Sequence, residues 1–369
     1  MKPLASTLPL HPIRGRGATG NPDNRFVPLA VELDPEHAAV EPGPATRFFH
    51  DTTRTLIARN DSPDIGFDYS INPYRGCEHG CIYCYARPTH EYLGLSAGLD
   101  FESKIFVKQD ASEILRRELS ARRWRPAAIT LSGVTDPYQP VERKLRITRG
   151  CLEVLAEFGN PLSVITKNHL VTRDIDILSE MARDGAAAVN LSITTLDAKL
   201  QGKMEPRTST PARRLAAIEE LSRAGIPVGV MVAPIVPGLT DQEVPAILRA
   251  VANAGARTAG FTVLRLPYAV SSLFEDWLAV HYPDRAAKII GLVKGLRGGR
   301  MNDSRFGHRM RGEGAYAEQI AALFRVTAAK LKLNRRRQAL STAAWRGARP
   351  GGVQADPAQQ LALFGGGDG

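Results

Sequence analysis

The chain has 369 residues, enough to bury a substantial core in one large domain with appendages or in two domains. It has no run of 18 apolar residues and no apolar N-terminal segment, so neither a membrane span nor a signal peptide is expected. Four cysteines are too few for a secreted disulfide scaffold, and the net charge of +10 favours a polyanionic partner, nucleic acid before membrane. We therefore expect a cytoplasmic protein.

Residues 1–60 contain Arg14-Gly15-Arg16-Gly17 and scattered prolines, with little periodicity. This composition predicts a mobile N-terminal arm, extended or wrapping, that is partly disordered.

Residues 61–300 alternate short β-branched runs with amphipathic segments. Strands are expected over 69–72, 128–132, 162–166, 188–194, 227–232 and 260–264. Helices are expected over 111–122, 148–158, 172–183, 211–224 and 241–254. This alternation predicts an α/β domain with a parallel sheet and crossover helices.

The first expected strand leads into Cys77, Cys81 and Cys84 at CxxxCxxC spacing, with Tyr83 directly before the third cysteine. Three thiolates can hold three irons of a [4Fe–4S] cluster and leave the fourth iron without a protein ligand. That iron can bind S-adenosylmethionine (SAM), and one-electron reduction then cleaves the sulfonium to a 5′-deoxyadenosyl radical. The alternative is a structural zinc site. It would need a further ligand such as His79, because Cys151 stands alone in the sequence.

The cysteine pattern resembles that of the radical SAM superfamily. The resemblance implies a partial (β/α)6 TIM-type barrel with its chemistry at the carboxyl ends of the strands. Polar residues follow several expected strands, among them Thr135, Lys167 and Ser192. Lys167 could pair with the SAM carboxylate, and the two hydroxyls could bind the cofactor, although each could equally be a satisfied strand-end group. Glu205 and Arg207, in the loop after the fourth expected strand, could reach the site, but a surface ion pair explains them at least as readily.

Within that superfamily the chain resembles the spore photoproduct lyase branch over roughly residues 64–270. The resemblance lies in Cys77-Glu78-His79-Gly80-Cys81-Ile82-Tyr83-Cys84-Tyr85, in Thr135-Asp136, in Val164-Ile165-Thr166-Lys167 and in Asn190-Leu191-Ser192-Ile193. It implies SAM contacts at Tyr83, Thr135, Lys167 and Ser192, and a hydrogen-atom relay through Tyr83 and Tyr85.

One position departs from that branch. Gly133 stands where the lyase has a hydrogen-donating cysteine, and a glycine cannot return a hydrogen atom. Cys151 could substitute as a catalytic residue. However, its helical pattern with Leu152, Leu155 and Phe158 favours a buried structural cysteine.

Residues 301–345 form a basic extension with an expected helix over 314–340. The residues predicted for its apolar face are Tyr316, Ile320, Leu323, Phe324 and Leu331. Arg335, Arg336 and Arg337 are candidates for binding nucleic-acid phosphates. The alternative is a solvated helix face followed by a disordered tail.

Residues 346–369 are expected to be a flexible tail. Within it, Gln360-Leu361-Ala362-Leu363-Phe364 resembles the bacterial sliding-clamp-binding motif. Leu363 and Phe364 would enter an apolar pocket, Leu361 would add a contact and Gln360 would fix the register. The alternative is a tail that folds back onto the core.

Together these features predict a radical SAM enzyme that repairs or modifies DNA, is recruited by the clamp and is reduced by an unidentified electron donor. Two rival hypotheses remain. One is a radical SAM enzyme that acts on RNA or a small molecule. The other is a zinc-stabilised nucleic-acid-binding protein without radical chemistry.

Overall fold

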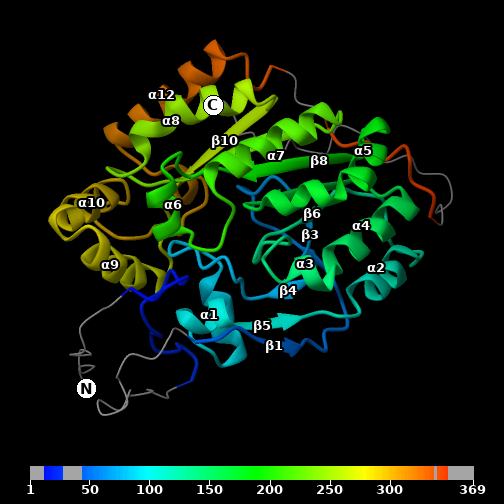
Figure 1. Ribbon diagram of the computed structural model, residues 1–369, viewed down its shortest axis with the longest axis horizontal. Helices are drawn as coiled ribbons and strands as arrows, with labels where there is room; N and C mark the ends of the chain where they lie inside the picture. Colours follow the sequence, from blue (N-terminus) through cyan, green and yellow to red (C-terminus); the bar gives the residue numbers. More distant parts are fainter. Residues whose placement is uncertain (1–11, 28–43, 336–338, 348–369) are drawn as a thin grey trace.

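The computed structural model describes residues 12–27, 44–335 and 339–347 (Figure 1). Its main element is a seven-stranded sheet in the order β10-β9-β8-β7-β6-β3-β2. All neighbouring strands in this sheet pair in parallel except β2, which adds antiparallel to β3. Six parallel strands with crossover helices confirm the expected α/β partial barrel.

The six parallel strands and the crossover helices coincide with the expected segments to within a few residues, whereas β2 was not expected. The strands are β2 (Ile57–Arg59), β3 (Tyr69–Ile71), β6 (Ile129–Leu131), β7 (Leu162–Thr166), β8 (Ala187–Ser192), β9 (Val228–Ile235) and β10 (Thr258–Val263). The helices are α2 (Ala111–Leu119), α4 (Ile147–Phe158), α5 (Ile175–Arg183), α7 (Pro211–Arg223) and α8 (Val244–Asn253). Shorter elements between them are α3 (Glu142–Leu145), α6 (Ala198–Met204), η2 (His169–Asp174) and η3 (Asp241–Glu243).

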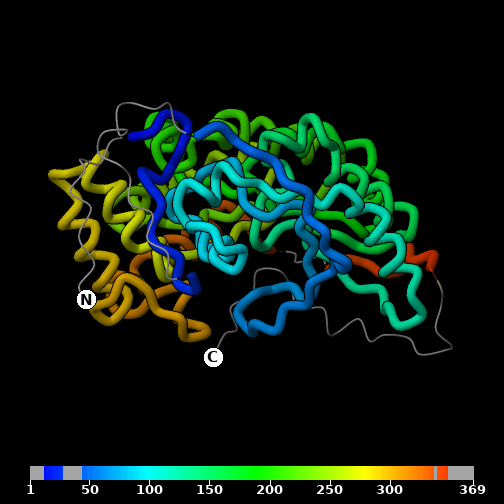
Figure 2. The backbone as a smooth tube through the Cα atoms, turned by 90° about the horizontal axis from the view of Figure 1, so that it is seen from below, coloured from blue at the N-terminus to red at the C-terminus, as the bar shows by residue number. Residues whose placement is uncertain are grey.

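The N-terminal part contains regular structure that the sequence did not predict. β1 (Arg47–His50) pairs in parallel with β5 (Lys104–Val107), which pairs antiparallel with β4 (Tyr74–Arg75). All four residues of β1 are exposed, so its sequence carries no buried-face alternation that would indicate a strand. Residues 12–27 run beside α1 (Leu99–Ser103) and η1 (Arg87–Leu93), as Figures 1 and 2 both show. β1 and β2 are therefore strands within the segment that was expected to be an arm.

The C-terminal part packs on the β10 side of the sheet. It comprises α9 (Val270–His281), α10 (Pro283–Gly295), α11 (His308–Arg311) and α12 (Ala315–Lys330). The ring centroids of Phe324 and Phe261 lie 4.7 Å apart, and Ile320 is also buried. Leu323, expected on the apolar face, is instead 41% exposed.

The helix expected over 314–340 ends at Lys330, because Lys332 and Asn334 adopt left-handed φ angles of 60° and 64°. Asn334 then pairs with the edge strand β10. The Ala259 amide donates to Asn334 Oδ1 at 2.9 Å, and Asn334 Nδ2 donates to the Ala259 carbonyl at 2.9 Å. The chain thus covers part of a sheet edge that would otherwise present unpaired backbone groups.

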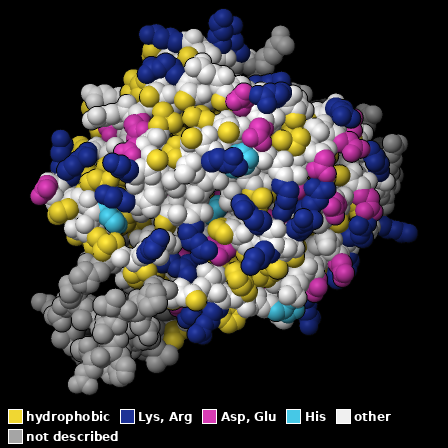
Figure 3. Space-filling model, in the orientation of Figure 1, with side chains coloured by type: hydrophobic (Ala, Val, Ile, Leu, Met, Phe, Trp, Pro, Cys, Tyr) yellow, Lys and Arg dark blue, Asp and Glu magenta, His cyan; other side chains and the backbone are white. Residues whose placement is uncertain are grey.

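Lys and Arg side chains are spread over the face of the molecule in Figure 3 and gather to the right of its centre. Within the described ranges, no helix is long and apolar enough to cross a membrane.

Candidate active site

The cysteine loop, residues 76–84, follows β3 and β4 and lies at the carboxyl ends of the parallel strands. The Cys77 amide donates to the Phe101 carbonyl at 2.9 Å, and the Ile82 amide donates to the Met204 carbonyl at 3.0 Å. Gly80, between the first two cysteines, has a φ of 65° that glycine adopts without strain. Two distant parts of the chain therefore fix the course of one short loop that carries three thiols.

The thiols of Cys77, Cys81 and Cys84 are free, and the first two residues are 7% and 8% exposed. Burial and then the charge of Glu205 raise the pKa of Cys81 well above its ordinary value. Bound iron would offset that burial cost, because a coordinated thiol is deprotonated by the metal. Three adjacent thiols without a fourth cysteine nearby fit a [4Fe–4S] cluster with one iron left open.

His79 does not offer the further ligand that a zinc site would need. Its Nδ1 lies 3.3 Å from Asp136 Oδ2, and its Nε2 lies 3.3 Å from Asn168 Nδ2. Burial lowers the pKa of His79, but Asp136 and Cys77 outweigh that effect and raise the pKa to about 10. Both of its ring nitrogens already face polar partners. In the described ranges, no group of three His, Cys, Asp or Glu residues is placed to hold a single metal ion.

Asp136 joins the cysteine loop to two strand ends. Besides His79, its carboxylate accepts from Thr166 Oγ1 at 2.7 Å and from the Lys167 amide at 2.8 Å. Burial raises the pKa of Asp136, but the charge of His79 and these hydrogen bonds lower it on balance. The side chains that follow β6 and β7 are thereby held in one hydrogen-bonded network.

Tyr83 lies in a buried charged network beside the cysteine loop. It is 6% exposed, and its hydroxyl donates to the carboxylate of Glu205. Arg214 forms an ion pair with the same carboxylate, and Thr194 Oγ1 donates to it at 2.7 Å. The Lys167 ammonium lies 5.9 Å from the centroid of the Tyr83 ring. Burial raises the pKa of Glu205, but Arg214 and Lys167 lower it to about 2 on balance.

Glu205 is a site residue for which the sequence left two alternatives open, a place in the site and a surface ion pair. It is fully buried, whereas Arg207 is part-exposed and pairs with Glu78 at 3.0 Å. The available signal was Leu200 and Met204, two apolar residues of α6 at helical spacing that turn this segment inward.

The other predicted cofactor contacts also lie at the carboxyl ends of the strands. Thr135 Oγ1 donates to the Gly76 carbonyl at 2.7 Å and so fixes the start of the cysteine loop. Ser192 ends β8 and is 5% exposed, and its carbonyl accepts from Arg214 at 2.8 Å. Their contact with SAM stays a prediction.

Tyr85 and Gly133 lie together at the entrance to the barrel. Tyr85 is 51% exposed, and its hydroxyl donates to the Gly133 carbonyl at 2.6 Å. A Cβ built on Gly133 would meet its nearest neighbours at 3.7 Å, although the φ of 129° disfavours a side chain. The position therefore has space beside Tyr85.

Cys151 lies away from this entrance. It is 0% exposed in the hydrophobic core, and burial raises the pKa of its thiol to about 12. This placement does not support a role as hydrogen donor and corrects that prediction. The helical spacing that favoured a structural cysteine is consistent with its position in α4.

Residues 16–18 pack directly on the cysteine loop, which the sequence did not predict. The Gly17 and Ala18 amides donate to the buried carboxylate of Glu102 at 3.0 and 2.9 Å. Arg87 pairs with that carboxylate, and its Nε donates to the Cys81 carbonyl at 2.9 Å. One buried ion pair therefore holds both the N-terminal segment and the backbone of a candidate cluster ligand.

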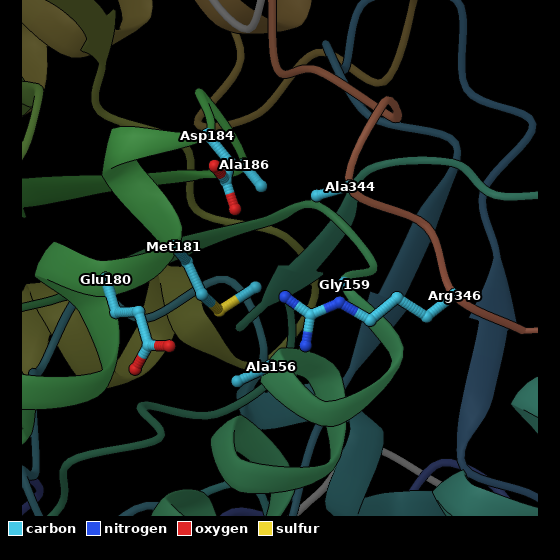
Figure 4. Close-up of a pocket in the computed structure, with 8 residues that line it drawn as sticks. All are labelled: Ala156, Gly159, Glu180, Met181, Asp184, Ala186, Ala344 and Arg346. Carbon is cyan, nitrogen blue, oxygen red and sulfur yellow. The ribbon is translucent and has the colours of Figure 1, made fainter.

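A separate surface pocket lies between the ends of α4 and α5 and residues 344–346 (Figure 4). α4 leads into β7 and α5 into β8, so this pocket is at the amino ends of the strands, opposite the cysteine loop. Arg335 is exposed after α12. Arg336, Arg337, Gln360, Leu361, Leu363 and Phe364 lie outside the described residues, so their predicted roles stay predictions.

Residues 71–251 match the family described as the radical SAM superfamily. An uncharacterised protein of Mycobacterium tuberculosis is 38% identical over 224 residues, which is 60% of this chain and 66% of that protein, just under two thirds. A Pseudomonas phage M6 protein named radical SAM Nα-GlyT isomerase is 30% identical over 173 residues, covering 46% of this chain and 34% of that protein.

Among solved structures, a spore photoproduct lyase variant aligns with a TM-score of 0.54 at 19% identity, over 80% of this chain and 86% of that one. The lyase complexed with dinucleoside spore photoproduct also gives a TM-score of 0.54 at 19% identity, over 77% of this chain and 79% of that one. These likenesses show the fold. Residues 71–251 are thus similar to radical SAM domains. Enzymes of this class use a [4Fe–4S] cluster and SAM.

Proposed function

We propose that the protein cleaves SAM reductively and uses the resulting radical to repair or modify DNA. Cys77, Cys81 and Cys84 would hold the cluster, and Tyr83, Thr135, Lys167 and Ser192 would line the SAM site. When bound, the cluster supplies the electron that cleaves SAM to a 5′-deoxyadenosyl radical. The proposal also includes a cytoplasmic location and an electron donor still to be identified.

The observation that carries the proposal is the pair of tyrosines on either side of the third cysteine. Tyr83 is buried against Lys167 and Glu205, while Tyr85 is half-exposed with its hydroxyl at Gly133. Tyr85 therefore connects the cluster loop to the position where the lyase branch has its hydrogen donor, and Tyr83 lies two residues away on the buried side of the same loop. This arrangement supports a relay that returns a hydrogen atom to a substrate at the entrance. The net charge of +10 favours a polyanionic substrate.

The test is anaerobic reconstitution with iron and sulfide, then reduction with dithionite in the presence of SAM and assay of 5′-deoxyadenosine. Wild type should form it, and Cys81→Ala should not. A DNA oligonucleotide should increase the yield, whereas RNA of the same sequence should not. Equal stimulation by RNA would favour the rival RNA enzyme, and bound zinc without SAM cleavage would leave a nucleic-acid-binding protein.

Isomerisation is a second candidate reaction, favoured by the name of the phage relative. The product distinguishes repair from isomerisation, and the amount of 5′-deoxyadenosine shows whether SAM is regenerated or consumed. A repair lyase or an isomerase that regenerates SAM would form little 5′-deoxyadenosine per product, whereas an enzyme that consumes SAM would form one for each. Mass spectrometry of the oligonucleotide together with 5′-deoxyadenosine counts distinguishes these outcomes.

Recruitment by the sliding clamp is proposed from residues 360–364. A synthetic peptide of residues 356–369 should bind a purified bacterial clamp in a fluorescence-polarisation assay. Replacing both Leu363 and Phe364 with alanine should abolish binding, because these side chains supply the apolar contacts. Equal binding by the double-alanine peptide would contradict the motif.

A further inference from the structure

Arg265 lies just beyond β10, at the same end of the sheet as the cysteine loop. Its Nε is buried and has no hydrogen-bond partner among the described residues. Its Nη1 contacts the sulfur of Met310 at 3.4 Å, and its guanidinium carbon lies 5.4 Å from the centroid of the Tyr85 ring. A guanidinium in this place loses hydration and gains only a weak sulfur acceptor in return.

Arg309 and Arg297 lie close enough to Arg265 to affect its charge or be affected by it. Burial and then the charge of Arg309 lower the pKa of Arg265. Burial and then the charge of Arg265 lower the pKa of Arg297 to about 10. Arg297 donates to the Leu264 carbonyl at 2.7 Å and to the His308 carbonyl at 2.8 Å, so it holds the end of β10 next to α11. Like charges kept this close favour binding of an anion between them.

Asp64 faces Arg309 from across the barrel, while Asp303 and Glu313 lie near Arg297. Arg309 Nε donates to Asp64 Oδ2 at 2.7 Å, and the Gly307 amide donates to the same oxygen at 3.4 Å. Asp64 follows β2, and Arg309 lies in α11 beyond β10, so the ion pair joins segments that follow the two outermost strands of the sheet. In Figure 2 these two segments face each other across the lower side of the molecule.

We propose that Arg265 and Arg309 bind a phosphate group of the nucleotide substrate beside Tyr85, and that Asp64 occupies Arg309 until substrate arrives. The proposal rests on the proposed action on DNA. Guanidinium groups match phosphate oxygens in a planar, two-pronged geometry that lysine cannot reproduce. A phosphate contact positions a nucleotide without reading its base. A phosphate on Arg265 would bring the attached sugar and base to the exposed ring of Tyr85.

The experiment measures binding of a fluorescein-labelled single-stranded DNA 12-mer to the reconstituted holoenzyme by fluorescence anisotropy. Arg265→Gln and Arg309→Gln should each weaken binding by about tenfold, because each loses a charge-assisted hydrogen bond to phosphate. Asp64→Asn should tighten binding, since the competing charge is removed. Arg223→Gln is the matched control: this arginine is 70% exposed on α7, pairs with Glu219 and should bind like wild type.

A 12-mer whose phosphates are replaced by neutral methylphosphonates should bind wild type and Arg265→Gln with equal affinity. Unchanged affinity of both arginine variants for the normal 12-mer would overturn the site while leaving the DNA proposal intact. Conversely, failure of wild type to bind the 12-mer, with Arg265-dependent binding of thymidine monophosphate, would overturn the DNA proposal and support the site. Weakened SAM binding with unchanged 12-mer binding would assign Arg265 to the cofactor and overturn the site.

If Arg265→Gln does not fold, Arg265→Lys keeps the charge and should give an intermediate loss of 12-mer affinity. Iron content equal to wild type shows that the holoenzyme has formed. Wild-type affinity in folded Arg265→Lys would contradict the planar phosphate contact.

Discussion

Glu205 is the residue on which the buried part of the site depends most. Its carboxylate is fully buried and meets Arg214, Tyr83 and Thr194. Arg214 is 1% exposed, so removing its partner would leave an uncompensated charge inside the protein. Such a change costs far more than loss of a surface ion pair.

We therefore predict that Glu205→Gln lowers the free energy of unfolding by about 3 kcal/mol. The control is Glu219→Gln, because Glu219 is 61% exposed and pairs with Arg223 on the surface. That variant should stay within about 0.5 kcal/mol of wild type. Urea denaturation of the apoprotein at neutral pH provides both values. Equal losses in the two variants would contradict the buried role of Glu205.

The sequence predicted the location of individual site residues where these residues directly follow or end a strand. Cys77, Thr135, Lys167 and Ser192 follow or end strands, and the carboxyl ends of parallel strands meet at one edge. Glu205 and Glu102 could not be placed in this way. Their burial depends on segments brought against them by the whole fold, and an isolated acidic residue is normally exposed.

Among the elements, the N-terminal segment 12–27 covers the cysteine loop most closely. A Cβ on Gly17 would lie 1.9 Å from the Gly80 carbonyl, so only glycine permits this approach.

β1 was not predicted from the sequence because all its residues are exposed, whereas β7 and β8 were predicted because their apolar runs are buried.

Gly17→Val should displace segment 12–27 and expose the cluster. If the overpacked valine makes the free energy of docking of this segment about 1.4 kcal/mol less favourable, the undocked population rises about tenfold. Oxygen bleaches the cluster absorbance in air. If undocking of segment 12–27 limits the access of oxygen, the rate of bleaching should rise by a similar factor. Gly20→Ala should behave like wild type, because a Cβ there meets nothing within 4 Å. Equal bleaching of Gly17→Val and wild type would contradict the covering role.

His90 in η1 makes the region beneath the cysteine loop sensitive to acid. Burial lowers its pKa from 6.5 to about 4, while its Nε2 lies 2.9 Å from the Lys104 carbonyl. Below pH 6.5 the unfolded chain takes up a proton that the folded chain resists. The stability that neutral His90 contributes is therefore complete above pH 6.5 and is lost progressively as the pH falls through about 4.

Between pH 7.5 and 5 this linkage should remove about 2 kcal/mol from the wild-type free energy of unfolding. His90→Gln cannot titrate in this range, so its loss over the same interval should be smaller by that amount. Urea denaturation of both apoproteins at the two pH values measures the difference. Parallel pH profiles would show that His90 is not the group responsible.

For the molecule as a whole, the excess of basic side chains governs the encounter with a polyanion. Figure 3 shows Lys and Arg spread over one face, in keeping with the net charge of +10. If about three phosphates of single-stranded DNA are neutralised, affinity should fall about 20-fold between 50 and 200 mM salt. Anisotropy titrations across that range give the slope. An affinity independent of salt would contradict phosphate binding.

Because residues 16–18 rest on the cysteine loop, the protein has an order of assembly. The loop is held by Phe101 and Met204, which are synthesised after Gly17, so we expect the N-terminal segment to dock only after residues as far as Met204 have folded. A scaffold protein that delivers iron and sulfide would meet the thiols before that docking step. A bulky N-terminal fusion would then interfere with insertion of the cluster rather than with catalysis. Such a fusion should lower the fraction of protein that carries iron.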